Sequence, residues 1–162
     1  MIQQWIRRLQ GKVGFWLLTL VWALAITNFS TDRFSIKRTS NYLEPMLRWF
    51  LPHASDLTIY VLHVIIRKAS HVTEYGIFAT LVFGIWAAEE THWQKRWLGY
   101  ALSVAALLSI IDEYHQTFTR MRVGTPSDSL IDTIGAAIAL LIIWRVKRDR
   151  FLPSTTDLRR AE

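Results

Sequence analysis

The segment RKASHVTEYG, residues 67–76, lies between two apolar segments, LTIYVLHVII at 57–66 and IFATLVFGIWAA at 77–88. It introduces four ionisable side chains into this apolar region: Arg67, Lys68, His71 and Glu74. A helix would place positions 67, 71 and 74 on one face, because they are four and three residues apart. A charge inside a bilayer costs about 2.5–3.5 kcal/mol near its centre. The segment therefore predicts charged partners on neighbouring helices.

The composition favours a membrane protein. Hydrophobic residues make up 51% of the 162 residues and form long blocks. Four blocks are close to the roughly 20 helical residues that cross a bilayer: residues 13–29, 69–88, 97–116 and 129–146. Each is predicted to be helical, because backbone polar groups in lipid need internal partners. We expect an all-α polytopic membrane bundle of about four transmembrane helices, formed by a single domain over residues 1–150, with a flexible cytoplasmic tail at 151–162.

Two segments before the second span are harder to place. Residues 57–66 are apolar but too short to cross a bilayer alone. They are expected to form an interfacial or re-entrant helix, or an extension of the second span. Residues 30–56 contain Pro45, Pro52 and charges of both signs, and are expected to form a loop.

Basic residues flank the apolar blocks. The net charge is +6, but there is no basic helix or aromatic platform, which argues against nucleic acid as a partner. Lys and Arg are more frequent on the side of the N-terminus, most clearly in WRVKRDR at 144–150, so both termini are expected in the cytoplasm. The chain has no cysteine, which excludes disulfides, thiolate catalysis and cysteine-ligated metals.

This topology places three polar clusters on the outer side of the membrane. The second span begins with residues 67–74, the third ends with Asp112, His115 and Gln116 on one helical face, and the fourth begins with Asp128 and Asp132. Elsewhere, Gly135 and Ala139 predict close helix packing. His53 and His63 are isolated and are not counted among the candidate ligands.

The polar set has several readings. The cations Arg67, Lys68 and Arg122 could neutralise the carboxylates and hold helix ends together. They could instead form an outward pocket for a phosphate or carboxylate. A third reading is a metal site made of His71, Glu74, Asp112, His115 and Asp132. In a fourth, His71 beside carboxylates is a general base.

Two motifs, in this order, resemble the VanZ-like family of bacterial integral membrane proteins: IIRKASHVTEYG at 65–76 and IIDEYHQTFTRMRVGTPSDSLIDTIGA at 110–136. The likeness covers roughly residues 20–145. It departs from the family pattern at Arg120 and Met121, where relatives often have Pro-Gly. The resemblance implies a multi-pass protein of the bacterial cytoplasmic (inner) membrane, from a family associated with resistance to the glycopeptide teicoplanin. Its signature positions are Arg67, Lys68, His71, Glu74, Tyr75, Asp112, Glu113, Gln116, Phe118, Arg122, Asp128, Asp132 and Gly135.

Together these observations predict an outward-facing site that binds or modifies an anionic lipid or envelope component. The expected partners are membrane lipids or lipid-linked envelope precursors, with no metal or cofactor assigned. The alternative is a non-enzymatic small transporter, or a partner of envelope-synthesis proteins, in which the charges lock the bundle. Within the site, Glu74 and Asp112 are expected to orient His71, and Asp128 and Asp132 to position the fourth helix. The candidate catalytic residues are His71, Glu74, Asp112 and Glu113. The candidate substrate-binding residues are Arg67, Lys68, Tyr75, Gln116, Arg122, Asp128 and Asp132.

Overall fold

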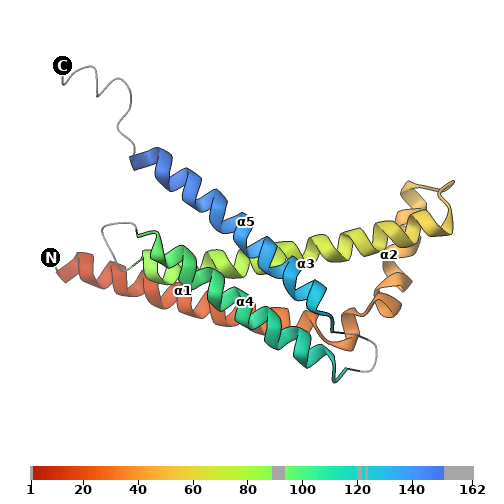
Figure 1. The fold of residues 1–162 in the computed structure, drawn as a ribbon, viewed down its shortest axis with the longest axis horizontal. Coiled ribbons are helices and arrows are strands. Elements are labelled where there is room, and N and C mark those ends of the chain that lie inside the picture. Colours follow the sequence, from red (N-terminus) through yellow and green to blue (C-terminus); the bar gives the residue numbers. More distant parts are fainter. Residues whose placement is uncertain (1, 89–93, 120–121, 123, 152–162) are drawn as a thin grey trace, which may run out of the picture.

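The computed structural model describes residues 2–88, 94–119, 122 and 124–151. This part of the chain is all helical (Figure 1), as predicted. Its elements are α1 (Ile2–Phe29), the 3₁₀ helix η1 (Asp32–Phe34), α2 (Ile36–Phe50), α3 (Asp56–Ala87), α4 (Arg96–Gln116) and α5 (Pro126–Phe151). The helices α1, α3, α4 and α5 form a bundle, and α2 packs on α3. The predicted tail lies outside the described residues, apart from Phe151, which ends α5.

The longest helix, α3, joins the short apolar segment 57–66 to the predicted second span. It begins where the Ser55 side chain accepts a hydrogen bond from the backbone N–H of Thr58, which satisfies one free amide of the first turn. Its 32 residues correspond to about 48 Å, more than the roughly 30 Å of a bilayer core. Residues 57–66 therefore form an extension of the predicted second span, and not a separate interfacial or re-entrant helix.

Residues 36–50 form the helix α2, so the expected loop is wrong for this segment. The helix forms because its apolar residues recur with helical spacing: Leu43 and the buried Leu47 lie on the side toward α3. Pro45 stands inside the helix, where it removes one backbone donor on the exposed side. An ion pair between Arg48 and Asp56 joins the end of α2 to the start of α3.

The helices α3 and α5 approach each other closely at Gly76 and Gly135. A Cβ on Gly135 would lie 2.5 Å from the carbonyl oxygen of Val72, so this position tolerates only glycine without a shift of a helix. A Cβ on Gly76 would lie 3.4 Å from both the Gly135 carbonyl oxygen and Ala139 Cβ. The predicted close packing at Gly135 and Ala139 is therefore confirmed. It determines which polar side chains of the two helices meet.

Two helices in the described part of the chain are long and apolar enough to cross a membrane. They are Gln10–Phe29 within α1 and Pro126–Lys147 within α5. The helices α3 and α4 are not apolar enough to meet the same criterion. Residues 67–74 interrupt the apolar sequence of α3, and Asp112 and Glu113 interrupt that of α4. The structure thus supports an all-helical fold with two helices of spanning character, and does not establish four spans.

Candidate functional site

The polar clusters of α3, α4 and α5 meet at one end of the bundle. The end of α1, the end of α4 and the start of α5 come together beside the middle of α3 (Figure 1). This follows from the antiparallel order of the helices, which brings residues far apart in sequence to the same end. The polar segments predicted to share one side of the membrane are therefore neighbours in the fold.

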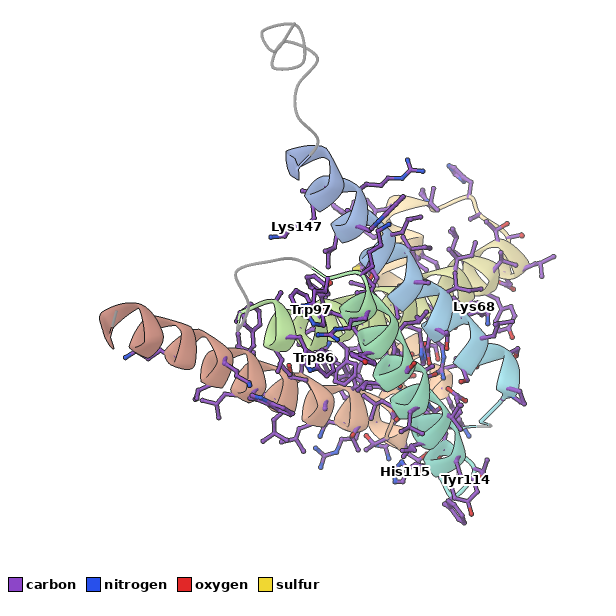
Figure 2. All side chains as sticks on the ribbon, turned by 60° about the vertical axis from the view of Figure 1, so that its left-hand side comes forward. Lys68, Trp86, Trp97, Tyr114, His115 and Lys147 are labelled. Carbon is purple, nitrogen blue, oxygen red and sulfur yellow. The ribbon has the colours of Figure 1, made fainter. Side chains whose placement is uncertain are left out.

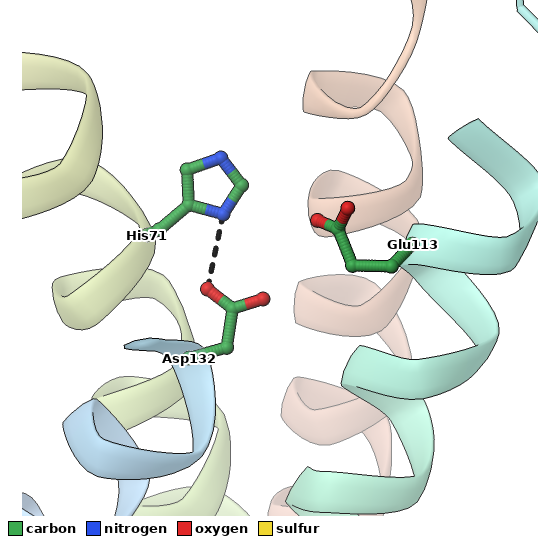
Figure 3. A group of neighbouring side chains, drawn as sticks. All are labelled: His71, Glu113 and Asp132. Carbon is green, nitrogen blue, oxygen red and sulfur yellow. Dashed lines mark hydrogen bonds and ion pairs between the residues drawn. The ribbon is translucent and has the colours of Figure 1, made fainter. Parts of the chain in front are cut away.

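His71 is held by Asp132. Its Nδ1 lies 3.0 Å from Asp132 Oδ1, and Ser109 Oγ donates to Asp132 Oδ2 at 2.9 Å. Figure 3 shows this contact, with the Glu113 carboxylate approaching from α4. Asp132 is fully buried, and its carboxylate is paired with side chains from two neighbouring helices, α3 and α4. The second ring nitrogen of His71, Nε2, has no partner among the described residues and is available to a ligand.

Asp112 has a different role from the predicted one. The sequence pattern predicts that it orients His71, but its Oδ2 accepts hydrogen bonds from Ser30 Oγ at 2.6 Å and Gln116 Nε2 at 2.9 Å. Ser30 directly follows α1, so Asp112 connects the end of α1 to α4. The structure gives the orienting contact with His71 to Asp132 instead.

Glu113 holds the chain before α5. Its Oε2 accepts from the backbone N–H of Thr125 at 2.8 Å, and its Oε1 accepts from Gln116 Nε2 at 3.1 Å. A Cβ on Gly124 would lie 2.0 Å from the Glu113 carbonyl oxygen, so glycine is required for this close approach. Both carboxylate oxygens of this predicted catalytic residue therefore have partners: Oε2 holds the segment before α5, and Oε1 pairs with Gln116 of the same helix.

The three predicted anion-binding cations differ in their partners. Lys68 Nζ pairs with Asp128 Oδ1 at 2.9 Å. Arg122 donates to the backbone oxygens of Phe29 and Phe34 at 2.6 and 2.9 Å. Arg67 has no hydrogen bond or ion pair within the part of the chain that the structure describes. It is therefore the cation most available to a ligand.

Arg122 also keeps an unused donor. Its Nη1 contacts Gln116 Oε1 at 3.3 Å, but its buried Nε has no partner among the described residues. Burial, followed by repulsion from Arg67, lowers the pKa of Arg122 to about 10. A bound anion would offset this cost, because it would pair with both guanidinium groups.

Two cavities adjoin at these side chains. The first, about 280 Å³, we call the cationic cavity, because its charged walls are Arg67, Lys68, Arg122 and Asp128. The second, about 250 Å³, we call the mixed cavity, because apolar side chains face polar ones across it. Arg67, His71 and Arg122 line both cavities. Among the residues of the mixed cavity alone are Phe29, Phe34, Leu43, His63 and Glu74.

Some predicted binding residues lie elsewhere, and one lining residue was not predicted. Tyr75 and Gln116 are buried and line neither cavity. His63 is buried and lines the mixed cavity, where its Nε2 lies 2.9 Å from Thr39 Oγ1. The sequence contains a signal for it, because positions 63, 67 and 71 are four residues apart and share a helical face.

The candidate metal ligands also differ from the predicted set. His115 is exposed and points away from the bundle at the end of α4 (Figure 2). Among the described residues, the group that could hold a metal is His71, Glu113 and Asp132, whose ligand atoms lie within 4.8 Å of one another. Their carboxylate oxygens already accept hydrogen bonds from Ser109, Thr125, Gln116 and His71 itself. A cation would have to displace these donors.

The fold and the site define an all-helical protein with an interior polar site at one end of its bundle. The VanZ/LLP1 family matches residues 15–148, and the chain belongs to this family. Both motifs on which the resemblance rests fall within the matched region. The family is linked to antibiotic resistance, and its match together with the two apolar helices fits a membrane protein. No curated protein and no solved structure matches the chain.

Proposed function

We propose that this protein is a four-span membrane protein whose polar site faces outward and binds or modifies an anionic lipid or another envelope component. Both termini then lie in the cytoplasm. The observation that carries the proposal is Arg67 beside Arg122 Nε, both without a partner in the described part of the chain, at cavities inside a helical bundle. Guanidinium groups bind phosphate and carboxylate groups through paired hydrogen bonds.

The outer surface of the bundle supports the membrane arrangement. Large apolar side chains are exposed on α1, α4 and α5, whereas the carboxylates Asp112, Glu113 and Asp132 are buried. A soluble monomer rarely exposes apolar side chains on this scale, while polar groups inside a membrane bundle face its interior. Exposed members of the apolar surface are Leu17, Val21, Leu24, Leu107, Ile110, Ile111, Ile134, Ile138 and Leu141.

The helix α2 takes the interfacial position in this arrangement. Tyr42, Met46 and Trp49 form an apolar stripe with helical spacing and are 83%, 49% and 77% exposed. Lys37 and Arg48 are exposed on another face of the same helix. A helix with aromatic residues on one side and basic residues on another is suited to the boundary between lipid and water.

Modification of the bound component would use His71. The hydrogen bond to Asp132 fixes the position of the imidazole ring, so that Nε2 faces a bound ligand. A general acid or base must contact the reacting group in this way. The Glu74 side chain also lines the mixed cavity, and its carboxylate accepts no hydrogen bond from the described residues. These two side chains are therefore the leading catalytic candidates, while Asp112 and Glu113 hold the helices.

The non-enzymatic alternative is favoured by the connections of the carboxylates. Asp112 joins α1 to α4, Glu113 joins α4 to the start of α5, and Asp132 joins α5 to α3 and α4. Under this alternative the charges only lock the bundle. Arg67 distinguishes the two proposals, because it takes part in none of these connections.

The test is lipid retention by the purified full chain, measured by native mass spectrometry after exposure to mixed micelles. The probes are phosphatidylglycerol, which is anionic, and phosphatidylcholine, which is neutral overall. The expected result is preferential retention of phosphatidylglycerol, reduced by Arg67→Ala and unchanged by Arg38→Ala, an exposed cation that lines neither cavity. Equal retention of both lipids, or equal effects of both substitutions, would contradict the proposed site.

A further inference from the structure

The charge of the cationic cavity indicates which anion fits it. Among the described residues, its charged walls are three cations and one carboxylate. Lys68 and Asp128 neutralise each other, which leaves Arg67 and Arg122 without a paired carboxylate among the residues that the structure describes. A phosphate monoester carries about −1.5 to −2 at pH 7, whereas a carboxylate or a phosphodiester carries one negative charge. Two guanidinium groups whose charges are not neutralised by a paired carboxylate match the monoester more closely.

The mixed cavity is unsuited to a second anionic group. Phe29 and Phe34 form part of its wall, with their rings in edge-to-face contact at 5.1 Å between centroids. Leu43 adds an aliphatic surface, and the Glu74 carboxylate lies on the same cavity. A carboxylate repels a phosphate but accepts a hydrogen bond from a hydroxyl group. An uncharged organic group therefore fits here.

The two cavities share Arg67, His71 and Arg122, so one ligand can occupy both. We propose that they bind a single phosphate monoester, with its phosphate in the cationic cavity and its esterified organic group in the mixed cavity. This inference rests on the proposed function, because it specifies the anion that the site recognises. The ester can be a lipid with a terminal phosphate or a water-soluble molecule, and the experiment separates these two sources.

The experiment compares matched ligands on the purified full chain in neutral detergent. Dioleoyl phosphatidic acid is a monoester, and dioleoyl phosphatidylmethanol has the same chains but is a diester. The monoester is expected to bind at least about tenfold more tightly, as one additional charge-assisted hydrogen bond would provide. Arg67→Ala should remove this preference, and Arg38→Ala should leave it unchanged. Arg67→Lys replaces Arg67→Ala if thermal unfolding shows that the alanine variant does not fold.

Two further probes identify the source and the position of the organic group. Glycerol 3-phosphate binding as tightly as phosphatidic acid indicates a soluble ester, whereas much weaker binding indicates a lipid. Leu43→Trp should fill part of the mixed cavity, weakening phosphatidic acid but not inorganic phosphate. An unchanged affinity for phosphatidic acid in this variant would contradict the placement of the organic group.

The failures of the two proposals are distinguishable. If both dioleoyl lipids bind equally and more tightly than phosphatidylcholine, the monoester inference is wrong and the anionic site remains. If neither lipid binds more tightly than phosphatidylcholine and glycerol 3-phosphate does not bind, both proposals are wrong. A monoester preference that survives Arg67→Ala would also overturn the inference, because the preference would then arise at another site.

Discussion

The hydrogen bond between His71 and Asp132 is made one helical turn or less from a close backbone contact of α3 and α5. His71 precedes Val72, whose carbonyl oxygen would lie 2.5 Å from a Cβ on Gly135, and Gly135 follows Asp132 by three residues. The close packing at Gly135 and the hydrogen bond between His71 and Asp132 therefore depend on each other. Glycine allows the two helices to approach until the imidazole and the carboxylate are 3.0 Å apart.

Gly135→Ala should separate these helices. The added methyl group must displace the backbone at Val72, and overpacking of this kind costs about 1–3 kcal/mol. The expected result is a lower unfolding temperature in detergent, together with weaker ligand binding at His71. Gly99→Ala is the matched control, because a Cβ at Gly99 would have nothing within 4 Å. That helical substitution should be neutral or stabilising by up to about 1 kcal/mol, and equal losses in both variants would argue against the close contact.

The same region shows how far the sequence predicts the site. The spacing of Arg67, His71 and Glu74, together with Gly135, predicts the shared face and the close helix packing, because both depend on local helical geometry. The partner of His71 depends on how far α3 and α5 slide along each other. Sequence spacing within one helix does not contain that information. The sequence pattern therefore predicts Asp112 as a partner that orients His71, whereas the placed helices give this contact to Asp132.

The helix α2 illustrates a second limit. Pro45, Pro52 and mixed charges are typical of a loop, and they outweigh the helical spacing of Leu43 and Leu47 when the segment is read alone. Contact with α3 stabilises the helix by burying Leu47, and this tertiary contribution is absent from local propensity. The cavity residue Leu43 therefore had no role in the sequence-based site.

The contact between Ser30 and Asp112 should carry a measurable coupling energy. Their oxygens lie 2.6 Å apart in a buried position, and a hydrogen bond to a charged group contributes about 1.5–3 kcal/mol. A double-mutant cycle of Ser30→Ala and Asp112→Asn, followed by thermal or denaturant unfolding, should show non-additive losses. Ser103→Ala, at an exposed position on α4, is a control that should add independently to Asp112→Asn. Additive losses for the Ser30 pair would mean that α1 is held by other contacts.

The proposed orientation predicts opposite labelling at the two ends of the bundle. Single cysteines are easily interpreted because the chain contains none. Ser127→Cys, exposed at the start of α5, should react with a membrane-impermeant maleimide in intact cells. Lys95→Cys, exposed before α4, should react only after the membrane is permeabilised. The reverse pattern would place the polar site in the cytoplasm and exclude outward-facing substrates.

The proposed interfacial position of α2 predicts a difference between two neighbouring faces of this helix. Met46 belongs to the exposed apolar stripe, whereas Asn41 lies with Lys37 and Arg48 on another exposed face. An environment-sensitive fluorophore attached to Met46→Cys should shift its emission to shorter wavelength in nanodiscs, because the stripe is expected to lie in the lipid boundary. The same label on Asn41→Cys should report water. Lipid-soluble quenchers should reduce the emission at position 46 more than at position 41, and equal quenching at both positions would place α2 away from the membrane surface.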